Sequence, residues 1–200
     1  HVQQGMAADN RIGLSYLSPG AGFGGENFSH DILTLANTVS GTGVKSQLLA
    51  QVWDINEQQK ELLFRKLWNY FHGDLKDKTV AIWGASFKEN TSRIQQSPIH
   101  MMLNALWAQG VKVRLHDPQA LIEIEALYGQ RDDLILCHDQ YQAVQGAHAL
   151  CLLTAWKQYW SPDYNRLHQT MLHPLILDGR NIYDPEYMKL QGFAYMGIGR

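Results

Sequence analysis

The chain has 200 residues and a formal charge of −2, because 17 Lys and Arg stand against 19 Asp and Glu. A charge this close to neutral excludes the strongly basic surface that nucleic acids and anionic membranes attract. With 45% hydrophobic and 18% charged residues, the chain has enough apolar side chains for one or two globular domains, so general disorder is excluded as well. We therefore predict a folded protein that binds neither nucleic acid nor membrane.

Location and metal binding are constrained by a few residue types. No apolar run approaches the roughly 18 to 20 residues of a membrane span, and the polar start, His1–Asn10, is unlike a signal peptide. Cys137 and Cys151 lie in apolar runs without the CxxC or Cys/His spacing of a metal site, and the nine histidines form no HxH, HxxxH or HExxH pattern. We predict buried thiols in a reducing compartment, a cytoplasmic location and no metal site.

The first half of the chain contains a glycine-rich segment, Pro19-Gly-Ala-Gly-Phe-Gly-Gly25, in which five of seven residues are Gly or Ala. Backbone amides without bulky side chains can approach a ligand closely, so we interpret this segment as part of a binding site. A tight connection between helices is the alternative. A helix is predicted after Asn27–Asp31, from apolar residues at three-to-four spacing at positions 32, 35, 36 and 39.

A second, longer helix is predicted after the interruption at Ser40–Gly43. Its apolar residues recur from Leu48 to Phe71, and Gly73 stands where a C-terminal cap glycine is expected. A helix of about 25 residues would be about 40 Å long at 1.5 Å per residue. Because its apolar residues, including Trp53 and Trp68, spread around more than one face, we predict a partner on two sides and a homodimer through this helix.

The pattern changes near residue 74, where we place a boundary between a helical region, residues 1–74, and a second domain, residues 75–200. Short apolar runs then alternate with helical segments. Strands are predicted at 79–83, 111–115, 134–137, 147–153, 175–177 and 193–198, and helices at 97–109, 140–144 and 162–171. Parallel neighbours need a covering crossover between them. The alternation therefore predicts an α/β chain whose second domain is a Rossmann-like parallel sheet.

Polar side chains follow two of the predicted strands, at the sheet edge where ligands bind in such folds. The turn Gly84–Lys88 keeps one glycine of the GxGxxG fingerprint, so we predict that this domain does not bind a dinucleotide in the usual way. Lys88 could hold a phosphate or a sugar hydroxyl, with a solvated loop lysine as the alternative. Asp178-Gly-Arg180 follows another strand, and a capping Asp or an Asp–Arg pair is the alternative there. An anion between Lys88 and Arg180 would explain both cations.

In their order and spacing, these segments resemble the landmarks of the UDP-glucose/GDP-mannose 6-dehydrogenase family. Further landmarks are Asp9-Asn-Arg-Ile-Gly13, Tyr16-Leu17, Asp117-Pro118, Gly146-Ala-His-Ala149 and Thr154-Ala-Trp156. The match spans nearly the whole chain and corresponds to the family's central dimerisation region followed by its UDP-binding domain. The resemblance implies UDP-sugar binding, two NAD-dependent oxidations at the sugar C6 and a place in polysaccharide biosynthesis. NAD would be held by an N-terminal domain that lies outside these 200 residues.

The resemblance also implies roles at matching positions. Arg11 would reach the substrate of the neighbouring subunit. Three cations, Arg11, Lys88 and Arg180, could surround a pyrophosphate with its two negative charges. The positions expected to shape the UDP-sugar pocket or to contact the nucleotide sugar are Arg11, Tyr16, Leu17, Phe23, Gly24, Phe87, Lys88 and Arg180.

The chain departs from the family at the nucleophile. The family's Gly-Gly-Ser-Cys-Phe-Pro-Lys-Asp is similar to residues 24–31 here, so Asn27 stands at the position of the cysteine thiolate that captures the aldehyde. An amide is not a usable nucleophile. Asp31, which the family would use to orient or activate water, is retained. Gln95 stands where the family has an arginine that helps to hold NAD, and Arg93 where it has an acidic residue.

Three hypotheses follow. We favour a nucleotide-sugar dehydrogenase homologue that binds a UDP-sugar and whose complete oxidation is abolished or severely impaired. A second possibility is an enzyme that stops at the aldehyde, or that passes through a hydrate with Asp31 as base. The third is a non-catalytic UDP-sugar-binding or regulatory paralogue that pairs with an active enzyme through the long helix.

Overall fold

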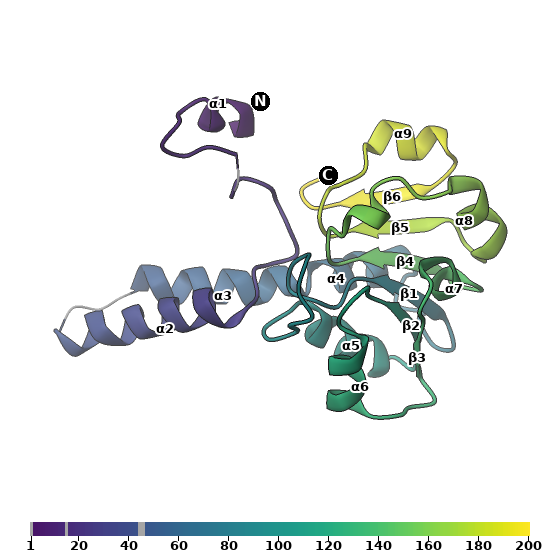
Figure 1. The fold of residues 1–200 in the computed structure, drawn as a ribbon, viewed down its shortest axis with the longest axis horizontal. Helices are drawn as coiled ribbons and strands as arrows, with labels where there is room; N and C mark the ends of the chain where they lie inside the picture. The colour runs from purple at the N-terminus through teal and green to yellow at the C-terminus, as the bar shows by residue number, and fades with distance from the viewer. Residues whose placement is uncertain (1, 15, 44–46) are drawn as a thin grey trace.

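The computed structural model describes residues 2–14, 16–43 and 47–200. A six-stranded parallel sheet forms the centre of the molecule, in the order β3-β2-β1-β4-β5-β6, which reads from bottom to top in Figure 1. Its strands are β1 (Thr79–Trp83), β2 (Lys112–His116), β3 (Leu134–Leu136), β4 (Ala149–Leu152), β5 (Leu175–Asp178) and β6 (Ala194–Gly197). All six strands lie within the runs predicted from the sequence or one residue beyond them, so the predicted α/β parallel sheet is confirmed.

Helices cover both faces of this sheet, and alternate strand residues point to opposite faces. In β1, Val80 and Ile82 pack with α4 (Leu62–Tyr70), α5 (Ile99–Trp107) and α6 (Leu121–Tyr128). Ala81 and Trp83 pack on the other face with α7 (Gln140–Val144), α8 (Tyr164–Thr170) and α9 (Pro185–Leu190). Because both faces are buried, the strands appear in the sequence as continuous apolar runs.

Some helices have different bounds from those predicted. The predicted helices at 97–109, 140–144 and 162–171 correspond to α5, α7 and α8. Four further elements were not predicted from the sequence: α6, α9, the short N-terminal α1 (Val2–Ala7) and a 3-10 turn, η1 (Lys157–Tyr159). Asp184-Pro185 was a usable signal for α9, since the Asp184 side chain accepts a hydrogen bond from the Tyr187 amide and proline occupies the first turn.

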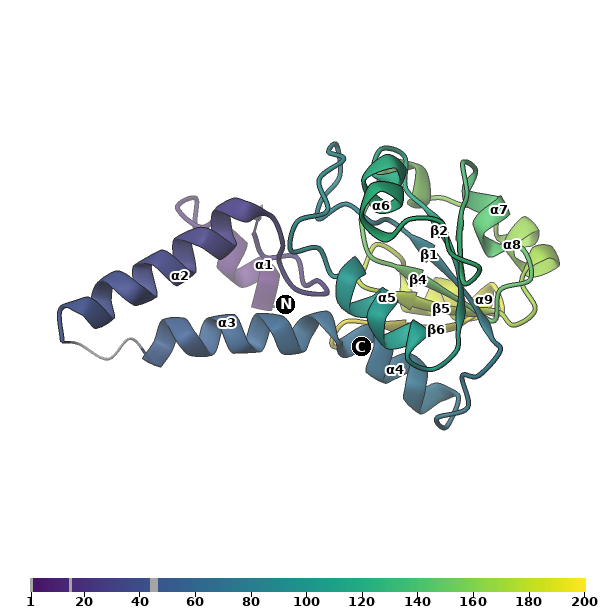
Figure 2. The same cartoon turned by 90° about the horizontal axis from the view of Figure 1, so that it is seen from below.

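The single long helix predicted from the second apolar pattern is wrong. Residues 44–46, just before that pattern, lie outside the described residues, and two helices follow, α3 (Gln47–Lys60) and α4, with Glu61 between them. Figure 2 shows α4 turning away from the line of α3. Two contacts explain the bend. Leu63 and Leu67 of α4 are fully buried against the sheet. The Arg65 side chain donates a hydrogen bond to the carbonyl oxygen of Gln58 in α3, at 3.2 Å.

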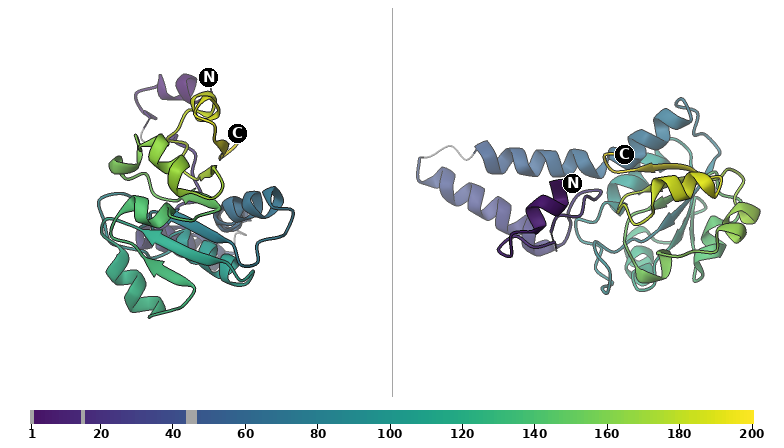
Figure 3. Two further views of the ribbon diagram at one scale, coloured as in Figure 1. Left: turned by 90° about the vertical axis from the view of Figure 1, so that its right-hand side faces the viewer. Right: turned by 90° about the horizontal axis from the view of Figure 1, so that it is seen from above.

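The α3 helix instead pairs with α2 (Glu26–Gly41) in a helical hairpin that projects from the sheet, as Figure 1 and the right-hand view of Figure 3 show. α2 runs through Gly41, so the predicted interruption at Ser40–Gly43 begins two residues later than expected. Within the described ranges, no helix has the length and apolar character needed to cross a membrane. The domain boundary near residue 74 stays a prediction, and the packing of α4 on the sheet joins that helix to the sheet's core.

Candidate functional site

The glycine-rich segment passes over the carboxyl ends of β5 and β1, where ligands bind in parallel sheets. At β5, the Ala21 amide donates to the Gly179 carbonyl at 2.9 Å. At the other end of the segment, the Gly25 amide donates to the Gln95 carbonyl at 2.9 Å. Gly24 has no room for a side chain, since a methyl group there would lie 2.6 Å from the Gln96 carbonyl oxygen. The glycines therefore allow the segment to lie directly on the neighbouring backbone.

Two side chains of α3 hold this segment from the other side. Asn56 makes a paired contact with the backbone of Phe23, because its Oδ1 accepts from the Phe23 amide at 2.7 Å and its Nδ2 donates to the Phe23 carbonyl at 3.1 Å. Gln59 Nε2 donates to the Gly20 carbonyl at 2.8 Å. Sequence reasoning missed both residues. The available signal was a pair of amide side chains three positions apart, which lie on one face of a helix.

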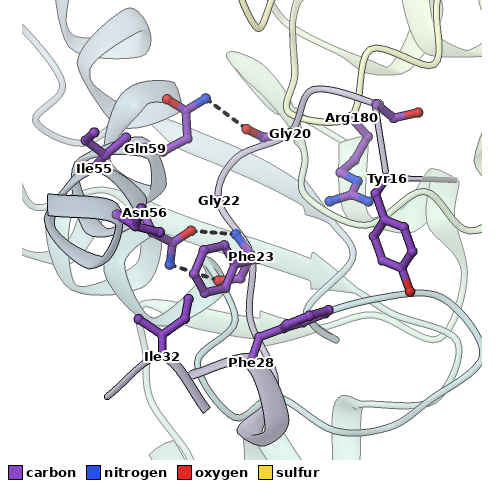
Figure 4. A pocket seen from close by; sticks show the side chains of 12 residues that line it. Tyr16, Gly20, Gly22, Phe23, Phe28, Ile32, Ile55, Asn56, Gln59 and Arg180 are labelled. Carbon is purple, nitrogen blue, oxygen red and sulfur yellow. Dashed lines mark hydrogen bonds between the residues drawn. The ribbon is translucent and has the colours of Figure 1, made fainter. Parts of the chain in front are cut away.

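A cavity of about 620 Å³ lies between the segment, the helical hairpin and the end of β5 (Figure 4). One wall is apolar and aromatic, and Phe28 stands edge-on to both Tyr16 and Phe23, with ring centroids 6.4 and 6.2 Å away. The half-buried Arg180 lies beside Tyr16 (Figure 4), and a methyl group on Gly20 would be 3.0 Å from its Nη1. The lining residues are Tyr16, Ser18, Gly20, Gly22, Phe23, Phe28, Ile32, Val52, Ile55, Asn56, Gln59 and Arg180.

A second cavity, also of about 620 Å³, brings together three positions that the sequence analysis selected: Asn27, Asp31 and Gln95. Asn27 and Asp31 lie on the first turns of α2, and Gln95 comes from the loop between β1 and α5. Asp31 is 76% exposed, with Oδ1 3.7 Å from Nδ1 of His30. The glycine-rich segment lines the first cavity through Gly22, and its last residue, Gly25, donates its backbone amide to the carbonyl of Gln95, which lines the second.

The other predicted contact residues lie outside the first cavity. Lys88 is exposed, and its Nζ lies 5.5 Å from the centroid of the Phe87 ring, which itself packs against Gly25. Leu17 is half-buried and does not line the cavity. Arg11 is 89% exposed and its Nη2 pairs with Asp9 at 2.6 Å, and this hydrogen bond raises the pKa of the guanidinium. Arg180 is thus the one of the three predicted cations that lines this cavity, and the roles of Lys88 and Arg11 stay predictions.

The turn after β1 is occupied by a side chain of the protein itself. Asp117 is 2% exposed, and its Oδ2 accepts from the amides of Ala85 and Ser86 at 2.7 and 3.0 Å. The same oxygen accepts from Ser86 Oγ and from Trp156 Nε1, and Oδ1 accepts from the amides of Gln119 and Ala120. In a dinucleotide-binding turn these backbone amides would face a pyrophosphate. Their use by Asp117 supports the prediction that this sheet lacks the usual dinucleotide site.

Replacing Asp117 by asparagine is expected to lower the free energy of unfolding by about 2 kcal/mol, because at least two of the donors around it would then face an NH₂ group. For a chain of this size, that corresponds to a fall in Tm of about 4 to 8 °C. Calorimetry or circular dichroism measures it, with the exposed Asp132→Asn as a control that leaves Tm unchanged. An unaltered Tm in Asp117→Asn would contradict the role given to this carboxylate.

Both cysteines are buried in the sheet domain, as predicted. Burial raises the pKa of the Cys137 thiol and raises that of Cys151 much further. The thiolate is the reactive form, so burial and a raised pKa both suppress its chemistry. Among the described residues, no group of three His, Cys, Asp or Glu side chains could hold a metal ion.

The native protein is therefore expected to react with an aromatic disulfide reagent at neither thiol on the timescale of minutes, and with two equivalents once it is unfolded in guanidinium. Absorbance of the released thiolate measures both numbers. One rapidly modified thiol in the native protein would show that Cys137 or Cys151 is available for chemistry.

Comparison with known proteins matches both parts of the chain. Residues 1–58 match the central domain of the UDP-glucose/GDP-mannose dehydrogenase family, and residues 81–185 match the UDP binding domain of that family. A UDP-glucose 6-dehydrogenase from Pseudomonas aeruginosa is 42% identical over the whole chain, and one from Rhizobium meliloti is 33% identical. The chain spans 45% of the length of each of these relatives.

Solved structures agree in fold. The UDP-glucose dehydrogenase of Pyrobaculum islandicum superposes with a TM-score of 0.81 at 25% identity, over 98% of this chain and 42% of that one. A GDP-mannose dehydrogenase from Pseudomonas aeruginosa superposes with a TM-score of 0.72 at 19% identity, over 100% of this chain and 45% of that one. The helical hairpin and the parallel sheet are thus found together in these neighbours as well.

Proposed function

Since the chain belongs to the UDP-glucose/GDP-mannose dehydrogenase family, we propose that it forms the central and UDP-binding part of an NAD-dependent nucleotide-sugar 6-dehydrogenase. The observation that carries this proposal is the cavity in which the Arg180 guanidinium lies against the glycine-rich segment. A pyrophosphate needs a cation and closely approaching donors, and Arg180 provides the cation on a rigid strand end. The aromatic wall of Tyr16, Phe23 and Phe28 provides flat apolar surface for a base or a sugar face.

The described residues do not themselves form a site for NAD. Asp117 uses the amides of the β1 turn, and Gln95 offers a neutral amide where the family resemblance implies a cation. We assign NAD to the region of the relatives that lies outside this chain. When bound, it would accept the hydride of each oxidation. The chain's own contribution is to bind the nucleotide sugar and to present Asn27 and Asp31 beside it.

The second cavity supports impaired oxidation. The family reaction needs a thiolate that captures the aldehyde and later leaves, and Asn27 can do neither. Asp31 is exposed in the same cavity and can accept a proton from water, so slow hydration of an aldehyde is the chemistry that remains open. Cys137 and Cys151 are buried in the sheet and cannot replace the missing thiol.

A homodimer is the proposed assembly. Large apolar side chains are exposed along both helices of the hairpin, among them Leu33 and Leu35 on α2 and Leu48 and Ile55 on α3, which are 44 to 78% exposed. Apolar side chains at this density on a projecting hairpin favour burial against a second copy. A second copy would also give Arg11 a neighbouring pocket to reach.

A non-catalytic UDP-sugar-binding or regulatory paralogue is the second candidate. It is favoured by the finding that two neutral amides, Asn27 and Gln95, line one cavity at the positions where the family resemblance implies a nucleophile and a cofactor-binding arginine. Both candidates require nucleotide-sugar binding. Titration calorimetry of the 200-residue chain with UDP and with UDP-glucose tests them together, and the expected result is one molecule bound per chain. Absence of binding to both ligands would overturn the proposed function.

A further inference from the structure

Lys60, at the end of α3, is a buried ammonium that the proposed function does not use. Its side chain is 2% exposed. Its Nζ donates to Glu57 Oε1 at 2.7 Å and lies 3.5 Å from Oε1 of Gln96 and 5.7 Å from the centroid of the Trp53 ring. Burying a charge carries a large desolvation cost, and Glu57 remains partly exposed. An apolar residue would fill this space at lower cost, so the position of the charge calls for an explanation.

On one side, the aliphatic stem of Lys60 supports the glycine-rich segment. A methyl group on Gly22 would lie 2.9 Å from Lys60 Cγ, and Gly22 has a φ of +86°, which only glycine adopts readily. Asn56, one turn earlier on α3, holds Phe23 through two hydrogen bonds. The glycine-rich segment that lines the first cavity therefore packs on one face of α3, and Lys60 makes the last of these contacts, at the C-terminal end of the helix.

On the other side, the Lys60 ammonium faces the loop that lines the second cavity. Gln96 has a φ of +55°, an unfavourable backbone conformation for a side chain of this kind, and its side-chain oxygen points at Lys60. The backbone carbonyl oxygen of Gln96 packs against Gly24, and the carbonyl oxygen of the neighbouring Gln95 accepts a hydrogen bond from the Gly25 amide. Lys60 thus contacts both the segment of the first cavity and the loop of the second.

We propose that Lys60 is a positioning residue that fixes the separation of residues 22–25 and residues 94–97. A ligand that orders the glycine-rich segment then also orders Gln95 and Gln96 beside Asn27. The identity of that ligand rests on the proposed function, whereas the link between the two segments does not. Lys60 touches neither cavity directly and acts through Gly22 and Gln96.

Hydrogen exchange followed by mass spectrometry on the 200-residue chain tests the link, with and without UDP. Lys60→Met keeps the length of the side chain and removes the charge. It is expected to speed exchange about tenfold in residues 22–25 and 94–97 while the sheet keeps its protection. UDP is expected to slow exchange in both segments of the unaltered chain, but only in residues 22–25 of the variant. Lys112→Met, at the exposed start of β2, is the matched control.

A second variant keeps the test decisive if Lys60→Met does not fold. Gln96→Asn introduces a residue type that tolerates positive φ, but its shorter side chain does not reach Lys60. This variant should speed hydrogen exchange in residues 94–97 and leave exchange in residues 22–25 unchanged. Unchanged exchange in both segments would overturn the proposal, and so would faster exchange spread over the whole sheet, because that result describes general destabilisation. If UDP does not bind the unaltered chain, the proposed function fails. The comparison of hydrogen exchange between the unaltered chain and Lys60→Met without ligand still tests whether Lys60 links the two segments.

Discussion

Replacing Arg180 by alanine is expected to raise the Kd for UDP about a hundredfold. A hydrogen bond to a charged group contributes about 1.5 to 3 kcal/mol, and each 1.4 kcal/mol corresponds to a factor of ten in affinity. Arg180 lies two residues after the last residue of β5, and the Asp178 carboxylate accepts from its backbone amide at 2.9 Å, so the strand end is held independently of the guanidinium. The loss should therefore appear in binding, with little change in Tm. Titration calorimetry measures it.

Two further variants show that the effect belongs to this guanidinium. Arg180→Lys should recover part of the affinity, since an ammonium supplies the charge without the planar pair of donors. Lys112→Ala removes the same charge at the opposite end of the sheet and should leave the Kd within twofold. A Kd for Arg180→Ala equal to that of the unaltered chain would remove Arg180 from the binding site.

Restoring the nucleophile is expected to have the largest effect on catalysis. When the chain is joined to the part of the Pseudomonas aeruginosa relative that lies outside the match, Asn27→Cys should raise the rate of complete oxidation of UDP-glucose by a factor on the order of 10³ or more. Asn27 is exposed at the start of α2 and lines the second cavity, so a thiol there would be accessible to a sugar aldehyde. NADH absorbance and the number of NADH formed per sugar measure the result.

The controls separate the thiol from the other departure in the cavity. Asn27→Ala changes the same position without a nucleophile and should stay at the starting rate. Gln95→Arg alone should improve NAD binding without completing the oxidation, and the double variant with Asn27→Cys should exceed Asn27→Cys alone. Two NADH per sugar from the chain with Asn27 in place, at a rate matching the cysteine variant, would show that oxidation is not impaired.

Much of the fold could be predicted from the sequence because strands and helices produce local patterns of apolar residues. Each buried strand is a short apolar run, and the alternation of such runs with helices required parallel crossovers. The bend after Lys60 could not be predicted in this way, since the apolar spacing continues from α3 into α4. What separates the two helices is the surface each one meets, as Leu63 and Leu67 pack on the sheet while α3 pairs with α2.

For the candidate site too, some features could be predicted from the sequence and others depend on the tertiary structure. Residue types and their order indicated the glycine-rich segment and the strand-end Arg180, and the family resemblance predicts that Asn27 stands in place of a thiol. Only the tertiary structure decided that Asn56 and Gln59 hold that segment from 33 and 39 residues away, and that Arg180 lines the cavity while Lys88 does not. The physical reason is that a hydrogen-bond partner or a cavity wall is chosen by proximity in the folded chain, whereas periodicity in a sequence encodes only which face of its own helix or strand a residue occupies.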